Sequence, residues 1–350
     1  MFGSSPPLST HASSNPLSPH SAASISVVPP GPGGVYDFAS RLAGPLDAPV
    51  VELSRTTDTS AWSGDLLLLH FSGYGYQKRG VPTWLNDEVR SLKKRFRVFG
   101  VVFHELYAFG PPWRSAFWLS GIQRKIAQEL ALQADFWLTN REVAAEWLMK
   151  HAPSVPHATM PVFSNVGEPV SIDAEGRNPK RARTMVVFGS SAMRMLVYAW
   201  NDGEIFKAAR QHGLQIHDIG PTIQDADMAR RMAREGVIVQ GRLSAEQVSD
   251  AMSRAEYGAL AYVPAHAAKS GIFAAYAAHG VCPVMLCKES AARDGFQPGI
   301  NYIDGFHALS GGKSSFDARL IGRAARLWYE PHSIDAQIAT LKKLSTEARS

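Results

Sequence analysis

The sequence has only two cysteines in 350 residues, Cys282 and Cys287, and neither has a His or Cys partner at the spacing of a metal site. A disulfide-stapled secreted scaffold is therefore excluded, and we expect two reduced thiols in a cytoplasmic protein. An uninterrupted apolar run is also lacking, because proline, histidine and lysine residues break up the most apolar stretch, 257–287. No membrane-spanning helix is predicted.

The sequence also lacks a large excess of positive over negative charge. The chain has 36 Lys and Arg against 31 Asp and Glu, and the small excess is spread over both halves. Nucleic acid is therefore not an expected partner. The densest basic run, 93–97, closes a predicted helix, where cations complement the helix dipole. The alternative for this run is a patch for peripheral contact with the inner face of a membrane.

Residues 1–24 lack the side chains needed for a packed core, since they are almost entirely Ser, Pro, Ala and His. This composition predicts a disordered leader. Lys and Arg are absent before Arg41, so we expect no signal peptide in this stretch.

After the leader, short β-rich runs alternate with amphipathic segments, which is typical of a parallel sheet covered by helices. The alternation stops at 165–183, where turn formers and charges predict a linker, and then restarts. We therefore predict an α/β fold with two Rossmann-like domains facing a cleft, at 25–164 and 184–330, followed by a C-terminal helix at 331–350. The predicted strands are 25–28, 50–53, 65–71, 98–104, 136–139, 184–188, 215–219, 237–239, 257–263 and 281–286. The main predicted helices are 36–42, 82–96, 120–134, 141–151, 192–212, 225–235, 245–255 and 271–279.

A glycine-rich loop follows the first predicted strand and brings Gly31, Gly33 and Gly34 to a strand-to-helix turn, where backbone can approach a ligand closely. A dinucleotide site is one alternative here, with Glu52 as the ribose ligand. The bulky Tyr36 stands where that fingerprint needs a third small residue. The match to an NAD site is therefore poor.

Two loops of the second predicted domain are candidates for binding an anion. In one of them, the first predicted strand of the second domain is followed by Gly189, Ser190 and Ser191, and Arg194 comes three residues later. These residues offer backbone N–H, hydroxyl and guanidinium donors. The alternative is a plain helix N-cap beside a surface arginine. Lys269, Ser270 and Gly271 begin a helix of small residues, where a diphosphate could also bind. Packing does not explain a lysine in so apolar a segment.

Two loops of the first domain also follow predicted strands, at the sheet edge where open α/β sheets bind ligands. One begins Phe-Ser-Gly-Tyr-Gly-Tyr-Gln-Lys-Arg-Gly at 71 and the other extends from 104 to 118. Their aromatic side chains could stack on sugar rings, and glycine neighbours make two of them unusual for core residues. These aromatic residues are Tyr74, Tyr76, Tyr107, Trp113 and Trp118.

Asp225 and Asp227 imitate a metal-binding acidic motif, but they lie at a predicted helix start, where acidic residues are favoured electrostatically. We interpret them as structural and predict no metal site.

Together these segments resemble the GT-B glycosyltransferases, in particular the group 1 or family 4 type, whose first domain carries Pro-Gly-Gly-Val before its first helix. The resemblance covers 25 to about 340. It is carried by Gly-Gly-Val-Tyr-Asp-Phe-Ala-Ser-Arg-Leu at 33, Tyr-Gly-Tyr-Gln-Lys-Arg-Gly-Val-Pro-Thr-Trp-Leu at 74, Phe-His-Glu-Leu-Tyr at 103 and Trp-Tyr-Glu-Pro-His-Ser at 328.

The resemblance implies a metal-independent transferase without a cofactor, which moves a sugar from a nucleotide-diphosphate sugar to a glycan or lipid-linked acceptor in polysaccharide or glycoconjugate synthesis. It places catalytic roles at His104, which follows the fourth strand, and at Glu105. The donor would contact Gly189, Ser190, Ser191, Arg194, Lys269, Ser270 and Gly271. The acceptor side would comprise Gly33, Gly34, Tyr74, Tyr76, Lys78 and Arg79.

The chain departs from the retaining members of this family, which carry two glutamates eight positions apart. Alignment on Gly280 puts alanines, Ala267 and Ala275, at these positions, and alignment on Pro283 puts Ala268 and Tyr276 there. A catalytically silent GT-B protein that binds a glycan or a partner enzyme is therefore the main alternative.

Overall fold

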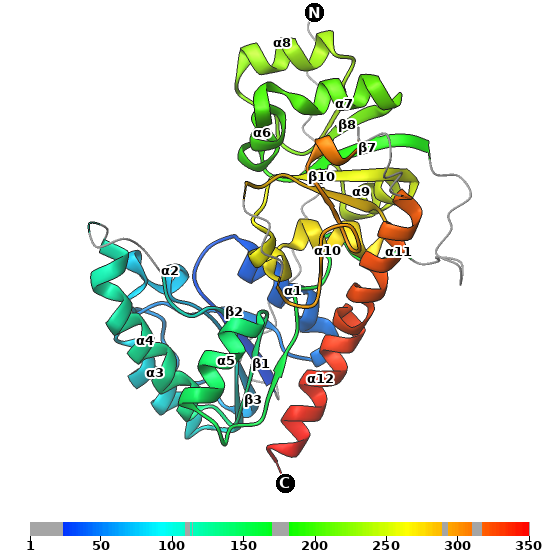
Figure 1. Ribbon diagram of the computed structural model, residues 1–350. Coiled ribbons are helices and arrows are strands. Elements are labelled where there is room, and N and C mark those ends of the chain that lie inside the picture. The colour runs from blue at the N-terminus through cyan, green and yellow to red at the C-terminus, as the bar shows by residue number, and fades with distance from the viewer. Residues whose placement is uncertain are drawn as a thin grey trace, which may run out of the picture.

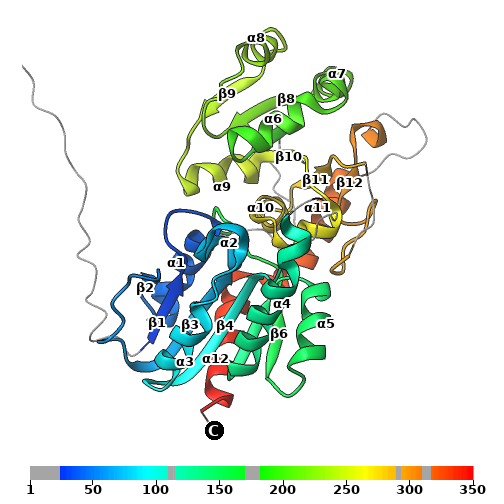
Figure 2. The same cartoon turned by 90° about the vertical axis from the view of Figure 1, so that its left-hand side faces the viewer.

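The computed structural model describes residues 24–108, 113, 115–169, 182–288, 293–309 and 317–349. The predicted leader, apart from Ser24, and most of the predicted linker lie outside these residues. Two parallel six-stranded sheets, each covered by helices, form the molecule, as Figures 1 and 2 show. This confirms the predicted α/β fold of two Rossmann-like domains.

The first sheet has the strand order β2-β1-β3-β4-β5-β6, and all its pairs are parallel. Its central strands are apolar runs buried on both faces, as parallel sheets require. The strands are β1 (Ser24–Val28), β2 (Val50–Glu52), β3 (Gly64–Ser72), β4 (Phe96–Glu105), β5 (Phe136–Thr139) and β6 (His157–Thr159). The helices are α1 (Gly34–Leu46), α2 (Gly73–Tyr76), η2 (Lys78–Gly80), α3 (Leu85–Lys93), α4 (Ser115–Gln133) and α5 (Glu142–His151).

The second sheet has the order β12-β11-β10-β7-β8-β9 and is also parallel. Its strands are β7 (Ala182–Phe188), β8 (Gln215–Ile219), β9 (Ile238–Gly241), β10 (Ala255–Leu260), β11 (Cys282–Met285) and β12 (Ile303–Asp304). Its helices are α6 (Ser191–Ala199), η3 (Trp200–Asp202), α7 (Glu204–His212), α8 (Ala226–Arg234), α9 (Ala245–Arg254), η4 (Pro264–Lys269), α10 (Gly271–Ala278), η5 (Phe306–Leu309) and α11 (Ala318–Tyr329).

Local details differ from the sequence prediction at one helix of the second domain and at the sheet edges, among other places. The helix predicted at 192–212 divides into α6 and α7, because Asn201, Asp202 and Gly203 adopt positive φ angles that a continuous helix does not allow. The short strands β6 and β12 were not predicted. Both lie at sheet edges, where few apolar residues mark a strand.

Two cations of the basic run at 93–97 are engaged within the first domain, and contact of this run with a membrane stays a prediction. Lys93 pairs with Asp135 at 2.7 Å, and Arg95 donates to two backbone carbonyls of the 59–60 turn. The helix already ends at Lys93, and the run continues into β4.

The end of the chain crosses between the domains. Through η6 (Glu330–His332) it passes from α11 of the second domain to α12 (Ile334–Glu347), which packs beside α1 of the first. Figure 1 shows α12 along the first sheet. Leu341 and Leu344 share a buried cluster with Leu42 and Leu66. Among the described residues no helix is both long and apolar enough to span a membrane.

Candidate functional site

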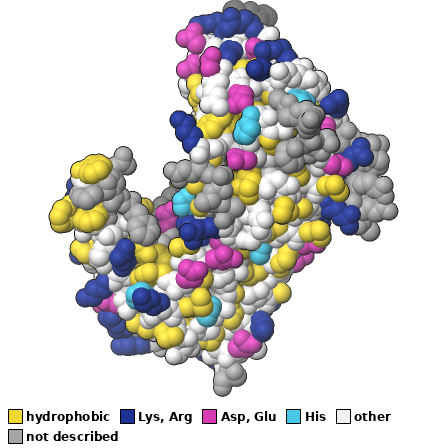
Figure 3. All heavy atoms as spheres, in the orientation of Figure 1, with side chains coloured by type: hydrophobic (Ala, Val, Ile, Leu, Met, Phe, Trp, Pro, Cys, Tyr) yellow, Lys and Arg dark blue, Asp and Glu magenta, His cyan; other side chains and the backbone are white. Residues whose placement is uncertain are grey.

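The carboxyl ends of strands from both sheets face a cleft between the domains, which is visible as the hollow in Figure 3. Both sheets reverse their strand order there, between β1 and β3 and between β7 and β10, and such switch points bind ligands in α/β folds. Two adjoining cavities of about 440 and 370 Å³ fill the cleft. They share His104, Glu105, Asn140 and Lys269.

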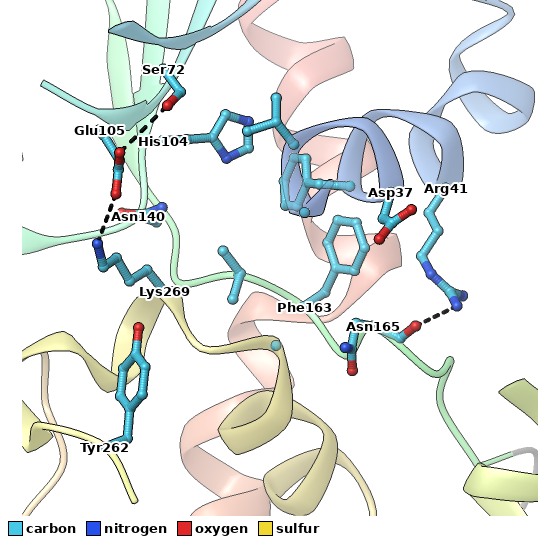
Figure 4. Close-up of a pocket in the computed structure, with 15 residues that line it drawn as sticks. Asp37, Arg41, Ser72, His104, Glu105, Asn140, Phe163, Asn165, Tyr262 and Lys269 are labelled. Carbon is cyan, nitrogen blue, oxygen red and sulfur yellow. Dashed lines mark hydrogen bonds and ion pairs between the residues drawn. The ribbon is translucent and has the colours of Figure 1, made fainter. Parts of the chain in front are cut away.

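Lys269 and Glu105 meet across the cleft, one from each domain. Lys269 Nζ lies 3.1 Å from Glu105 Oε1, and Ser72 donates a long hydrogen bond of 3.4 Å to Oε2. Figure 4 shows both side chains at the cavity wall. The sequence around Lys269 gives no sign of this partner, because Glu105 lies 164 positions away.

His104 lines both cavities and stands next to a second histidine, His70, which is fully buried in β3. His104 Nε2 is 3.2 Å from His70 Nδ1, and the two rings are stacked. Burial lowers the pKa of His104 to about 4. Burial, with a smaller contribution from His104, also lowers the pKa of His70 well below its usual value. Both imidazoles are therefore neutral at pH 7 and can donate or accept one hydrogen bond per nitrogen.

Helix α10 begins at the cleft, with the backbone of Gly271 at the wall of the larger cavity. The hydroxyl of Ser270 caps this helix by accepting from Phe273 N. Ser270 is buried and so serves the helix rather than the cavity surface. A side chain at Gly271 would approach Asn165 to 3.1 Å, so glycine lets the interdomain segment pass close to the helix. Lys269 and this helix start together make the second domain's wall electropositive.

Arg194 does not point into the cleft, and its predicted contact with a diphosphate is wrong. Its side chain is 1% exposed and forms a buried ion pair with Asp218 of β8. It also donates to the carbonyls of Gly189 and Pro221. The guanidinium thus fastens the loop after β7 to the neighbouring strand.

The other residues of that loop also lie outside both cavities. Ser190 caps α6 by accepting from Met193 N, which is the helix-cap alternative. Gly189 has φ +132°, and a side chain on it would approach Ile272 Cδ1 to 2.7 Å. The loop after β7 therefore packs directly against the first turn of α10. Ser191 is the first residue of α6 and is not at either cavity wall.

On the first domain, the structure brings together part of the predicted acceptor side. Gly34 lines the larger cavity and Tyr74 the smaller one, together with Tyr107. Tyr76 is a core residue instead, because its hydroxyl donates to the carbonyls of Val27 and His70. The predicted acceptor role of Tyr76 is wrong for this reason.

Several predicted residues do not line either of the two cavities. These residues are Gly33, Lys78, Arg79, Trp113 and Trp118. Lys78 and Arg79 are exposed in η2, and the backbone carbonyl of Arg79 accepts a hydrogen bond from the Gln123 side chain. Trp113 and Trp118 are exposed outside these walls, and their stacking on a sugar stays a prediction. Glu52 accepts a hydrogen bond from Gly31 N at 3.2 Å, so its carboxylate serves its own glycine loop.

Other functional candidates were missed, because no role was predicted for Asp37 and Arg41 within the motif at 33–42 and the segments of Arg141 and Tyr262 carry no motif. Asp37 and Arg41 of α1 line the larger cavity, and Arg41 donates to Asn165 O at 2.5 Å (Figure 4). Arg141 lines the smaller one. Its Nε is buried and has no hydrogen-bond partner among the described residues. Tyr262 stands across from Glu105, and burial followed by the Glu105 charge raises its pKa. The phenol is therefore protonated and able to donate.

The positions that correspond to the family's paired glutamates are buried in the second domain. Ala267, Ala268 and Ala275 have no exposed surface of note, and the Tyr276 hydroxyl is bonded to backbone groups of β7 and β10. The carboxylates at the walls of the two cavities, within the described part of the chain, are Asp37 and Glu105.

Asp225 caps α8 by accepting from Met228 N, and Asp227 pairs with Arg230, as the structural interpretation predicted. Among the described residues, no three His, Cys, Asp or Glu side chains are grouped so that they could hold a metal ion.

No protein-family model matches the sequence, and no curated protein is significantly similar to it. Solved structures do match. A lipopolysaccharide outer core galactosyltransferase, WaaB, is 12% identical with a TM-score of 0.51, over 93% of this chain and 99% of its own. An α-glucosyltransferase in complex with UDP-glucose and DNA containing an abasic site is 11% identical with a TM-score of 0.50, over 92% and 98%. At these identities the likeness concerns the fold. The chain has the two-domain GT-B fold of these glycosyltransferases.

Proposed function

We propose that the protein transfers a sugar from a nucleotide-diphosphate sugar to a glycan or lipid-linked acceptor. One observation carries this proposal. Lys269 and the start of α10 form an electropositive wall of the cleft, and His104 and Glu105 face that wall from the other domain. A leaving diphosphate needs positive charge on one side, and an attacking hydroxyl needs an acceptor for its proton on the other.

Lys269 is the residue that would bind the diphosphate. Its ammonium is held by Glu105 in the structure at 3.1 Å, and a diphosphate would compete for it with two charges instead of one. Once released, the Glu105 carboxylate is free to accept the proton of an acceptor hydroxyl. Neutral His104 would orient the transferred sugar through a hydrogen bond rather than through charge.

The proposed reaction uses no cofactor, and Lys269 with the α10 N-terminus does the electrostatic work that a metal ion does in other transferases. We expect turnover to persist in a strong chelator. Loss of turnover on chelation and its return with Mn²⁺ or Mg²⁺ would contradict this part of the proposal. The cytoplasmic location and a role in polysaccharide or glycoconjugate synthesis stay predictions.

The test is calorimetric titration of UDP, GDP and ADP into the full-length protein, followed by mass-spectrometric detection of hydrolysis or transfer over a panel of sugar nucleotides. Lys269→Ala should weaken binding of the preferred nucleotide about tenfold or more, since it removes a charge-assisted contact. Lys342→Ala, an exposed lysine of α12, is the matched control and should bind like wild type. Equal affinities in all three proteins would remove Lys269 from the donor site.

A catalytically silent binding protein is the second candidate, and the alanines and tyrosine at the paired-glutamate positions favour it. Nucleotide binding without turnover of any donor, with glycan acceptors present, would establish this alternative over the transferase.

A further inference from the structure

A group of large apolar side chains lies exposed at the start of α4, outside both cavities. Trp113 is 82% exposed and Trp118 72%, and Phe117 and Ile122 are each 44% exposed. Figure 3 shows apolar side chains gathered at this tip of the first domain. We call these four residues the α4 patch. Isolated apolar residues are common on surfaces, but two tryptophans grouped with a phenylalanine and an isoleucine mark an interaction site.

The charge in the segments beside the α4 patch is mainly positive. The described residues of segments 73–86 and 106–128 include four Lys and Arg and no Asp or Glu. Lys78 and Arg79 of η2 are exposed, and η2 packs against α4. Lys125 lies on the same helix and is 77% exposed, with its ammonium 3.9 Å from the Glu129 carboxylate. The acids that bound these segments are engaged: Asp87 by Arg90, Glu105 by Lys269 and Glu129 by Asn86.

We infer that the α4 patch docks the protein onto an anionic membrane surface. Tryptophan and phenylalanine side chains favour the boundary between lipid headgroups and acyl chains, and flanking lysines and arginines are attracted to anionic lipids. A second copy of this chain fits less well as the occupant, because two such surfaces would bring like charges together.

The patch also adjoins the cleft. Ile122 is followed by Gln123, whose side chain lines the smaller cavity beside Tyr74 and Tyr107. If the proposed function holds, docking through the α4 patch puts this cavity next to the lipid surface and favours the lipid-linked class of acceptor. The docking itself is measured without donor or acceptor, so its failure is separate from a failure of the transferase proposal.

The experiment is sedimentation of the full-length protein with two kinds of vesicle. One kind contains phosphatidylcholine alone, and in the other about one lipid in three is the anionic phosphatidylglycerol. We expect binding to the anionic vesicles that weakens with added salt. The Trp113→Ala/Trp118→Ala double variant should bind the anionic vesicles at least about tenfold more weakly than wild type, because it removes the apolar anchors. Lys78→Glu should weaken binding about fivefold or more and leave the aromatic anchors in place.

The matched control is Leu320→Ala/Leu327→Ala on α11, which removes two leucines that are also more than half exposed. It should bind vesicles like wild type. Circular dichroism melting checks that all variants fold, as their exposure predicts. Absence of vesicle binding by wild type, or equal binding by the tryptophan variant, would overturn the inference. Two other results would also overturn it. One is a dimer of the wild-type protein that is absent in the tryptophan variant. The other is binding to single-stranded DNA, without binding to vesicles, that is absent in the tryptophan variant.

Discussion

At the scale of single residues, two cationic side chains have different roles in this molecule. Lys269 stands at the cavity wall with an exchangeable partner, whereas Arg194 is buried against Asp218 with three backbone or side-chain acceptors. Tyr198 adds a second hydrogen bond to that carboxylate at 2.9 Å. The Arg194 network therefore supports the fold, and its loss should affect stability before ligand binding.

Arg194→Ala should lower the free energy of unfolding by about 3–5 kcal/mol, because it leaves the Asp218 charge buried without its partner. Urea denaturation measures this change. The control is Arg230→Ala, which breaks the exposed pair with Asp227 and should cost less than about 0.5 kcal/mol. A loss of nucleotide affinity in Arg194→Ala at unchanged stability would contradict our assignment.

His70 and His104 make stability depend on pH. Their folded-state pKa values are lowered, that of His104 to about 4, so the unfolded chain binds protons more readily than the folded one between pH 6.5 and 4. The stability is thus complete above pH 6.5 and is lost as the pH falls toward 4.

We expect the free energy of unfolding to drop by more than about 1.4 kcal/mol from pH 7 to pH 4.5 through these histidines, since each unit of pKa shift is worth that amount. Denaturant titration at a series of pH values tests this. Carboxylates also lower the free energy of unfolding in acid. The readout is therefore the slope of this free energy against pH, compared between wild type and His70→Gln. Identical slopes would show that the buried pair does not titrate as described.

At the scale of elements, α12 is the part of the chain that ties its two halves together. It follows the second domain in sequence, yet Leu341 is 2% exposed within a cluster built largely by the first domain. The Gln337 side chain donates to Pro161 O at 2.7 Å, which fixes the helix to the segment leading out of the first sheet.

Leu341→Ala should destabilise the protein by about 2–5 kcal/mol, the usual cost of a buried leucine with the cavity that it leaves. Leu327→Ala on the exposed face of α11 should change stability by less than about 0.5 kcal/mol. Thermal melts of both variants make the comparison. Similar melting temperatures would mean that α12 does not pack on the first domain in solution.

At the scale of the whole molecule, polar contacts beside the cleft join the two domains, in addition to the buried apolar cluster that both domains share. Glu142 N donates to Asp294 at 2.7 Å, Val162 N donates to Ala268 O at 2.8 Å, and Lys269 pairs with Glu105. Ligands that exchange such contacts shift domain angles in hinged proteins.

We predict that the preferred nucleotide diphosphate changes the radius of gyration in small-angle scattering, because it replaces Glu105 as the partner of Lys269. Lys269→Ala should not show the change at matched occupancy, and Lys342→Ala should. A wild-type radius that is the same with and without bound nucleotide would argue against a hinge.

The sequence by itself determined the architecture and the ends of the strands where the site lies. Alternating buried runs and amphipathic segments are local signals, and the edge that carries ligands follows from parallel order. His104, Lys269 and Tyr74 were therefore predictable as cleft residues.

Only the tertiary structure decided which of the predicted side chains serve the cleft. Arg194 needs Asp218 from the neighbouring strand, and Lys269 needs Glu105 from the other domain, and neither pairing has a local signal. Trp113 and Trp118 follow a strand that leads to the cleft, yet both are exposed and line neither cavity. Side-chain direction depends on packing between distant segments, which composition and spacing do not encode.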